Sequence, residues 1–225
     1  MIPRTLEPEV MDTEQEAVDY DSMDHAEVNR RFVAEFLEFA KHHPNPSVPR
    51  ILDVGTGTAQ IPIELCRQHS SCHIVAIDLS REMLKLGEKN IETAGLTERI
   101  RLEFIDAKAL PYDDHQFDAV ISNSIIHHIP EPSPVLGEMK RVLRPGGVLF
   151  VRDLLRPEEE PTLEQLVQTY AGDENAHQQK MFRESLHAAL TIEEMQAMLQ
   201  AHQLPPEWVQ TTSDRHWTIA GCLSV

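Results

Sequence analysis

The chain has 225 residues, of which 41% are hydrophobic and 25% are charged. This length allows one α/β domain with a substantial core, and the apolar runs are far shorter than the roughly 20 residues that a membrane-spanning helix needs, so no membrane span is expected. The formal net charge of −17 at pH 7 repels phosphate backbones, which argues against DNA or RNA as a partner.

The amino-terminal stretch is strongly acidic. Between Glu7 and Glu27 there are nine acidic side chains and no Lys or Arg, a composition typical of a solvated or partly mobile arm. We predict an arm or lid over residues 1–26 that is able to order over a ligand, followed by a single domain over residues 27–225.

The predicted compartment is the cytoplasm. The amino terminus lacks the basic start and apolar segment of a secretory signal. The three cysteines, Cys66, Cys72 and Cys222, include no CxxC pair, and their odd number indicates reduced thiols rather than a disulfide framework.

The first predicted helix follows the arm. Asp24 is a suitable cap, and apolar residues recur at helical spacing as far as Ala40, before His42, His43 and Pro44 end the helix. From Arg50 onward, short apolar runs alternate with amphipathic stretches, which is typical of βαβ units and a parallel sheet.

The alternating elements extend over a core of residues 50–153. Strands are predicted over residues 51–54, 74–77, 101–105, 119–122 and 148–152. Helices are predicted over residues 59–68, from a cap at Ser80 to a stop at Gly95, and over residues 133–143, where Pro145-Gly146-Gly147 forms a sharp turn into the next strand.

The rhythm changes after the core. Helical segments near residues 163–170 and 176–190 predict a helical cap over residues 154–190, inserted at the strand ends. In residues 191–225, Thr191 caps a helix to about residue 201, and strands over 208–211 and 216–220 form a hairpin. The predicted fold is therefore α/β, a Rossmann-like seven-stranded, mostly parallel sheet with helices on both faces and an antiparallel C-terminal hairpin.

The most informative motif is the run RILDVGTGTA over residues 50–59, a buried strand that enters a glycine turn and then a helix. Gly55 and Gly57 allow a tight turn and a close approach of the backbone to a ligand. Asp78 ends the next strand, where a carboxylate can accept hydrogen bonds from both hydroxyls of a ribose. Folds that bind NAD share both features, so these residues alone do not select the cofactor.

The third and fourth strands distinguish the alternatives. Asp106 ends the third strand, and it is followed by the runs LPYDDHQFDAV (110–120), SNSIIHHIP (122–130) and MKRVLRPGG (139–147). Over residues 50–153 this ordered series resembles class I S-adenosylmethionine-dependent methyltransferases, and it is similar to the small-molecule branch that includes ubiquinone-biosynthesis enzymes. The resemblance implies S-adenosyl-L-methionine as cofactor, S-adenosyl-L-homocysteine as product and a small-molecule acceptor with an O, N or C nucleophile.

The resemblance also implies a role for each residue at the strand ends. Asp53, Gly55 and Gly57 would surround the methionine portion, and Asp78 would hold the ribose. Ala59 departs from the pattern, because many relatives have a third glycine there. Its single methyl group is a small change, and we expect the turn to differ slightly.

Further contacts are implied at the next strand ends. They comprise apolar packing on adenine or ribose (Leu79, Met83), contacts to adenine (Asp106, Ala107) and positions near the amino acid portion and the sulfonium (Asn123, Ser124). Tyr20-Asp21-Ser22-Met23 resembles a stretch that covers the cofactor in this branch.

No catalytic residue is singled out. A general base matters only if the acceptor must lose a proton, and the candidates are Tyr20, His25, His128 and His177. The pair His127-His128 is common across the branch whatever the substrate, which favours a structural role. No set of His, Cys and carboxylates has a recognisable ligand spacing, so no metal site is predicted. Three alternatives stay open: a non-catalytic module that binds the cofactor, an NAD-linked oxidoreductase and a protein methyltransferase.

Overall fold

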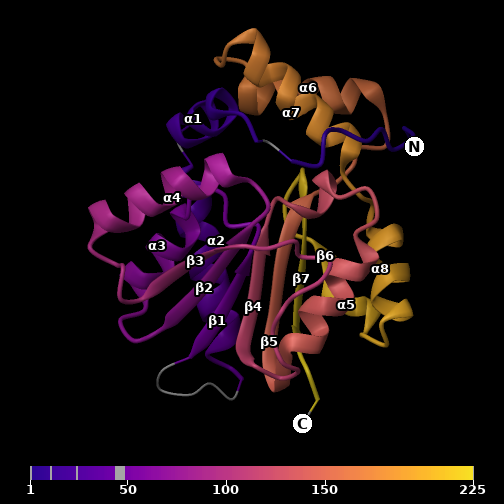
Figure 1. Ribbon diagram of the computed structural model, residues 1–225. Coiled ribbons are helices and arrows are strands. Elements are labelled where there is room, and N and C mark those ends of the chain that lie inside the picture. The colour runs from indigo at the N-terminus through magenta and orange to yellow at the C-terminus, as the bar shows by residue number, and fades with distance from the viewer. Residues whose placement is uncertain (1, 11, 24, 44–48, 225) are drawn as a thin grey trace. The chain divides into compact units, whose positions relative to one another are not determined.

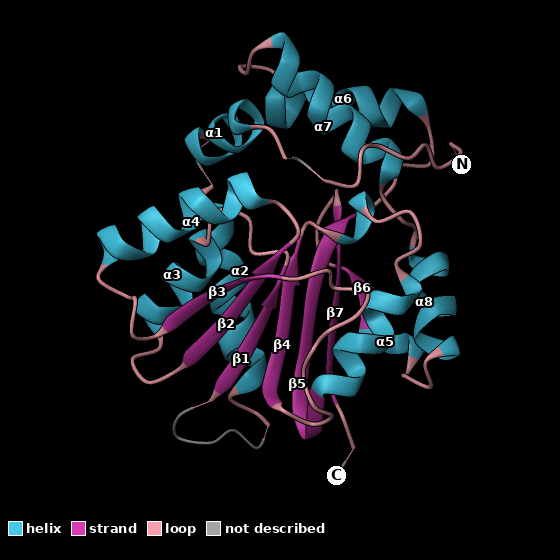
Figure 2. Cartoon of the chain, in the orientation of Figure 1, coloured by secondary structure: helices cyan, strands magenta, loops and turns pink. Residues whose placement is uncertain are grey.

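The computed structural model of the chain describes residues 2–10, 12–23, 25–43 and 49–224. The predicted helix cap at Asp24 lies outside these residues. In the part described, seven strands form one sheet in the order β3-β2-β1-β4-β5-β7-β6 (Figures 1 and 2). They are β1 (Arg50–Val54), β2 (His73–Asp78), β3 (Ile100–Phe104), β4 (Phe117–Asn123), β5 (Leu143–Leu154), β6 (Val209–Thr211) and β7 (His216–Cys222).

The pairing of the strands confirms the predicted fold class. β1 is parallel to both β2 and β4, and β2 is parallel to β3, whereas β6 and β7 are antiparallel. The predicted C-terminal hairpin is therefore present, with Val209 opposite Ile219. Its first strand begins at Val209 and not at Trp208, because residues Pro206–Trp208 form a 3-10 turn.

Eight α-helices accompany the sheet in the described residues. They are α1 (Glu14–Ser22), α2 (Ala26–Ala40), α3 (Gln60–Gln68), α4 (Arg81–Ala94), α5 (Ser133–Val142), α6 (Glu160–Ala171), α7 (Ala176–Ala188) and α8 (Ile192–Ala201). Two predicted caps are confirmed: the Ser80 hydroxyl accepts the N–H of Met83, and Thr191 forms a capping box with Glu194. None of these helices is long and apolar enough to cross a membrane.

Two local predictions were wrong. Gly146 and Gly147 do not form a separate turn before the strand, because they belong to β5 and exchange backbone hydrogen bonds of 2.9 and 3.0 Å with Leu223. The helix predicted to reach residue 190 ends at Ala188, since Leu190 instead forms a parallel bridge with Leu155. In both places the pairing of distant backbone groups overrides the local pattern.

The chain folds into two compact units. The first unit comprises Val10–Asn123, Gly137–Val151 and Ala220–Val225, and the second comprises Met1–Glu9, Ser124–Leu136 and Arg152–Ile219. The acidic amino-terminal stretch therefore contributes residues to both units.

The core of the first unit lies between one face of the sheet and three helices. Alternate strand residues such as Ile51, Ile74 and Ile121 point to this face because side chains along a strand alternate, and they pack with apolar residues of α2, α3 and α4. Phe32 of α2 meets the ring of Phe150 edge-on, with 5.3 Å between centroids. Each such buried side chain contributes about 1.5–3 kcal/mol, and this packing fixes the strands whose ends carry the site.

The core of the second unit joins its helices to the first residues of the chain. Leu163, Val167 and Leu186 of the neighbouring helices α6 and α7 pack together with Ile2 (Figure 1). The N–H of Ile2 donates to the Glu158 carbonyl at 3.0 Å. Residues at the amino terminus are thus part of a folded unit, which their acidic composition does not indicate.

Candidate functional site

The predicted cofactor residues of the first unit lie at one edge of the sheet. Because β1 to β4 are parallel in the register Asp53 opposite Ala76 and Ile121, and Asp78 opposite Phe104, their carboxyl ends meet at the same edge. Asp53, Asp78 and Asn123 stand at the ends of β1, β2 and β4. The parallel pairing alone brings these three polar side chains to a common border.

The glycine turn after β1 is held by the end of β2. The N–H groups of Gly55 and Thr56 donate to the carbonyl of Ile77 at 2.9 Å, and the Gly57 N–H donates to Asp78 Oδ2 at 2.8 Å. Gly55 and Gly57 have φ values of 73° and 54°, a region that L side chains rarely adopt. The turn therefore favours glycine at both positions.

Ala59 occupies a conformation that usually belongs to glycine. Its φ is 63°, in the left-handed region, and its side chain is buried where α3 begins. This backbone conformation costs an alanine roughly 1 kcal/mol. The third position of the turn therefore has a left-handed backbone conformation although its residue is alanine.

Asp53 is buried with its charge poorly compensated. Its side chain is 1% exposed, and burial, aided by the nearby Asp78 carboxylate, outweighs the opposing effect of the Thr56 hydroxyl and raises the pKa of Asp53 to about 7. The Thr56 hydroxyl is close enough to favour the charged carboxylate, but neither it nor Asp53 Oδ2 makes a well-aligned hydrogen bond within the described residues, and the buried Thr58 hydroxyl makes none. Three orphaned polar atoms around one glycine turn indicate a place for a polar ligand, because buried polar groups are normally paired.

Asp78 and the start of α4 form the next part of this edge. Asp78 Oδ1 accepts the N–H of Ser80 at 2.8 Å, so both carboxylate oxygens receive backbone donors. Leu79 is half-buried and Met83 is 5% exposed. The carboxylate is therefore fixed in orientation, and the apolar residues Leu79 and Met83 follow it in the chain.

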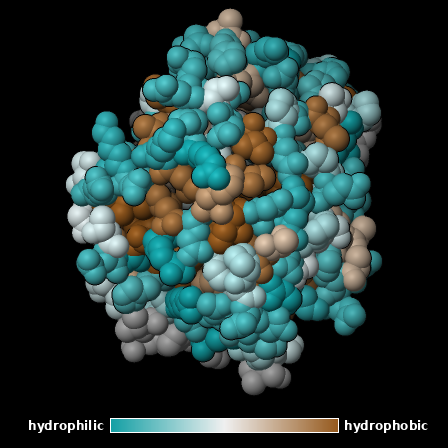
Figure 3. Space-filling model, viewed as in Figure 1, coloured by the Kyte–Doolittle hydropathy of each residue, from teal (hydrophilic) through white to brown (hydrophobic). Residues whose placement is uncertain are grey.

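The ends of β3 and β4 are more open. Asp106 is 44% exposed and its Oδ1 accepts the N–H of Lys108 at 2.9 Å, while Ala107 is half-buried. Phe104 is 43% exposed, and hydrophobic atoms gather beside α4 and β3 in Figure 3. Ser124, which follows Asn123 but belongs to the second unit, has a φ of 60° and donates its N–H to the Arg152 carbonyl.

The structure adds a helix that the composition did not predict. Residues Glu14–Ser22 form α1, which begins with a capping box between Thr13 and Glu16. Asp12, just before the cap, accepts the N–H of Arg81 at 2.9 Å and the hydroxyl of Ser80 at 3.2 Å, both at the start of α4. The sequence signal T-x-x-E was available for this helix, but the run of acidic residues concealed it.

Helix α1 brings Tyr20 to the glycine turn. A Cβ atom on Gly57 would lie 3.5 Å from the Tyr20 ring, and the ring of His25 is 4.8 Å from that of Tyr20. Burial and the charges of Asp78 and Asp53 raise the pKa of Tyr20 to about 12. Tyr20 therefore holds its proton at neutral pH and suits the role of a donor better than that of a base.

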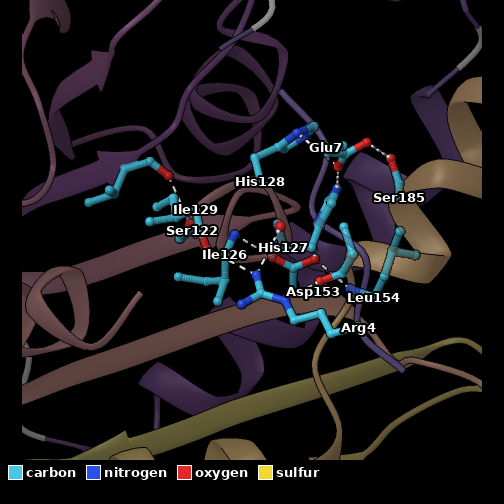
Figure 4. Close-up of polar contacts among 12 residues, drawn as sticks. Arg4, Glu7, Ser122, Ile126, His127, His128, Ile129, Asp153, Leu154 and Ser185 are labelled. Carbon is cyan, nitrogen blue, oxygen red and sulfur yellow. Dashed lines mark hydrogen bonds and ion pairs between the residues drawn. The ribbon is translucent and has the colours of Figure 1, made fainter. Parts of the chain in front are cut away.

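The other two base candidates lie in the second unit. His128 belongs to a polar cluster with Glu7, His127 and Asp153 (Figure 4). His177, at the start of α7, is exposed and donates its backbone N–H to Asn175. The structure thus pairs Tyr20 with His25 in one unit, places His128 in a cluster of the other and leaves His177 on the surface.

The cluster is built around the buried ring of His127. Its Nδ1 atom contacts Asp153 Oδ1, and its Nε2 atom lies 3.5 Å from Glu7 Oε1. Burial opposes the charged imidazole, but the attraction of Asp153 and Glu7 more than offsets burial and raises the pKa of His127. The sequence does not indicate Glu7 and Asp153 as partners of this histidine, because they are distant from it along the chain.

Comparison with known proteins gives a consistent result. A family model described as a methyltransferase domain matches residues 47–205. The ubiquinone/menaquinone biosynthesis C-methyltransferase UbiE of Geotalea daltonii is 34% identical over 129 residues, which is 57% of this chain and 52% of that protein. The 27-O-demethylrifamycin SV methyltransferase of Amycolatopsis mediterranei is 30% identical over 165 residues, 73% of this chain and 57% of that protein.

These relatives are longer, so the chain spans little more than half the length of the curated relatives it matches. A solved structure of a SAM-dependent methyltransferase from Aquifex aeolicus superimposes with a TM-score of 0.66 and 16% identity, covering 94% of this chain and 98% of that one. At this identity the superposition shows a shared fold.

Proposed function

This chain belongs to the methyltransferase domain family, and on that premise we propose that it transfers a methyl group from S-adenosyl-L-methionine to a small-molecule acceptor and releases S-adenosyl-L-homocysteine. Bound S-adenosylmethionine supplies an electrophilic methyl group on a sulfonium. The residues of the chain bind and orient the reactants and exclude water, and this positioning can contribute several kcal/mol to catalysis.

The observation that carries the proposal is the set of orphaned polar atoms at the glycine turn. Among the described residues, Asp53 Oδ2 and the Thr56 hydroxyl are buried with no well-aligned hydrogen bond, and the buried Thr58 hydroxyl has none. The amino acid portion of the cofactor has an ammonium and a carboxylate, and these groups complement a buried carboxylate and two hydroxyls. A bound ammonium would also stabilise the charged form of Asp53.

The remaining residues of this edge fit the adenosine portion. Asp78 is held in a fixed orientation by two backbone N–H groups, and a carboxylate at this strand end suits the two ribose hydroxyls. Leu79, Met83, Asp106 and Ala107 are proposed to border the base, with Asn123 toward the reactive end. We further propose that α1 acts as a lid, because it places Tyr20 beside Gly57.

The acceptor is proposed to be a small molecule, since the relatives named above act in quinone biosynthesis or on a rifamycin precursor. A net charge of −17 makes a nucleic acid a poor alternative. If the acceptor is a hydroxyl or phenol, its proton must leave, and the reaction then needs a general base. The free thiols of Cys66, Cys72 and Cys222 support the cytoplasm as its compartment.

Calorimetric titration of S-adenosylhomocysteine and of NAD tests the cofactor. We expect S-adenosylhomocysteine to bind and NAD not to bind. Asp78→Asn should weaken binding roughly 10-fold or more, because hydrogen bonds to a charged group contribute about 1.5–3 kcal/mol. Asp113→Asn, which changes an exposed aspartate, is the matched control and should bind as the unaltered protein does.

Turnover tests the reaction itself. Release of S-adenosylhomocysteine in the presence of quinol, phenol and amine acceptors would support methyl transfer. Binding without release across such a panel would instead favour a non-catalytic module, and tight NAD binding without S-adenosylhomocysteine binding would reject the proposal.

A further inference from the structure

Two imidazoles and one carboxylate of the second unit converge on a common point. In Figure 4 the rings of His127 and His128 and the carboxylate of Glu7 point toward one another. Their ligand-type atoms, one from each residue, all lie within 4.8 Å of one another. The side chains of His127 and Glu7 are only 3% and 10% exposed, so the arrangement belongs to the interior.

Ion pairs of Glu7 with both histidines hold the three groups together, but the closest of these contacts is not a well-aligned hydrogen bond. The Nδ1 atom of His128 lies 3.0 Å from Glu7 Oε1, yet both atoms are buried and neither makes a hydrogen bond within the described residues. The distance between His127 Nε2 and the same Oε1 atom is 3.5 Å. A shared cation could replace these contacts when both imidazoles are neutral, because Nε2 of His127 and Nδ1 of His128 would then offer lone pairs beside the Glu7 carboxylate.

The spacing suits a common ligated cation. Zinc binds imidazole nitrogen and carboxylate oxygen at about 2.0–2.2 Å in tetrahedral geometry, which separates neighbouring ligand atoms by roughly 3.3–3.5 Å. Two of the three separations, 3.0 and 3.5 Å, are already close to this value. A small rotation of the partly exposed His128 ring would bring the third separation, between the two imidazole nitrogens, close to the same value.

The surroundings hold these ligands in place. Asp153 contacts Nδ1 of His127, which fixes the ring and directs Nε2 toward Glu7, as carboxylates do behind the histidines of metal sites. The second oxygen of Glu7 accepts the Ser185 hydroxyl at 3.2 Å. Arg4 donates to the Ala188 and Ile129 carbonyls at 2.7 and 2.9 Å, and so anchors the segment that carries Glu7.

We propose that Glu7, His127 and His128 bind a divalent transition-metal ion of the zinc type through Oε1, Nε2 and Nδ1. Two imidazoles and a carboxylate are a donor set suited to Zn²⁺, Co²⁺ or Fe²⁺ rather than to Mg²⁺ or Ca²⁺. Three protein ligands leave a coordination position for an oxygen of water or of a small molecule. The ion would link the first residues of the chain to the turn Ile126–His128, and the inference does not depend on methyl transfer.

The sequence does not reveal this site because its ligands are far apart. Glu7 lies in the acidic stretch, while His127 and His128 follow β4. Adjacent histidines have no recognisable metal-ligand spacing, and only the fold of the second unit brings the carboxylate to them.

Metal titration of the full chain tests the proposal. The protein is freed of any affinity tag and dialysed against a chelator, and then titrated with Zn²⁺ by calorimetry and with Co²⁺ by visible absorption. We expect one equivalent of each ion to bind, d–d bands of Co²⁺ with nitrogen and oxygen ligands, and a rise in melting temperature with Zn²⁺, since an ion that binds the native state stabilises it.

Two variants locate the ion. Glu7→Gln and His128→Gln preserve side-chain size, leave the buried His127–Asp153 pair intact and should each weaken Zn²⁺ binding at least roughly 10-fold, as losses around metal sites do. His177→Gln, which changes an exposed histidine of the same unit, should leave binding unchanged. Circular dichroism confirms that each variant is folded.

The opposite outcomes are equally clear. If neither ion binds the unaltered protein, Glu7 and the two histidines form only an ion-pair network. If the ions bind but Glu7→Gln and His128→Gln retain the full affinity, the ions sit on surface histidines. Either result overturns the proposal.

Discussion

The Asp53 carboxyl destabilises the folded chain when it is charged, although its charged form is the one proposed to bind the cofactor. Its carboxyl is buried at the end of β1, and burial, with the Asp78 charge nearby, raises its pKa to about 7. Below pH 4 both the folded and the unfolded chain hold this proton. Between pH 4 and 7 only the folded chain retains it, so the free energy of unfolding falls as the pH rises through this window, and above pH 7 the loss is complete.

Replacement of Asp53 by Asn should remove this pH dependence. One pKa unit corresponds to about 1.36 kcal/mol. From pH 5 to pH 8 we therefore expect the free energy of unfolding of the unaltered protein to fall by about 2–3 kcal/mol more than that of Asp53→Asn. Urea denaturation at the two pH values measures it, with Asp113→Asn as the control at an exposed position. The same variant should bind S-adenosylhomocysteine more weakly; an unchanged pH dependence would mean that Asp53 is solvated.

Residues whose role follows from the strand on which they lie could be predicted from the sequence. Asp53, Gly57 and Asp78 each stand at the end of a predicted parallel strand, and the fold places them at one edge. The contacts between Glu7 and His127, and between Tyr20 and Gly57, could not be predicted in this way. They join segments distant in the chain, and no local periodicity encodes them.

At the scale of elements, α1 shows how a polar helix is held without an apolar face. Asp12 accepts two donors at the start of α4, where a negative charge is also favoured by the helix dipole. Asp21 accepts the amides of Gln60 and Asn90 at 3.1 and 2.9 Å. Carboxylates near both ends of α1 therefore attach it to α3 and α4.

Loss of the Asp12 carboxylate should release the beginning of α1. For Asp12→Ala we expect faster amide hydrogen exchange over residues 12–23 and a loss of about 1 kcal/mol, the usual value of a helix cap, with weaker S-adenosylhomocysteine binding if α1 is a lid. Gln15→Ala is the control, because the Gln15 amide donates to Asp19 within α1. Equal exchange in both variants would show that Asp12 does not hold the helix.

The elements that the sequence predicted well are those with apolar periodicity. α2, α3 and α4 bury a regular stripe against the sheet, and Ser80 and Gly95 mark both ends of α4. α1 has one buried residue, Ala17, so its hydrophobic pattern is too weak to predict it. The extra length of β5 was also missed, because its first residues pair with the chain's last ones rather than following an alternating pattern.

At the scale of the whole molecule, the dominant feature is an excess of negative charge. The chain has 37 acidic and 20 basic side chains. Exposed ion pairs such as Lys41–Glu38 contribute about 0–1 kcal/mol each. Two like charges roughly 20 Å apart in water repel by about 0.2 kcal/mol, and the excess of acidic side chains contains many such pairs. Repulsion should therefore outweigh the surface ion pairs.

Salt should consequently stabilise the protein. Raising NaCl from about 10 mM to about 150 mM shortens the screening length from about 30 Å to about 8 Å, and we expect the free energy of unfolding in urea, an uncharged denaturant, to rise. A double variant Glu88→Gln and Glu92→Gln, at exposed positions of α4, reduces the net charge from −17 to −15 and should respond less to salt. A stability that falls with salt would mean that favourable ion pairs outweigh the overall repulsion.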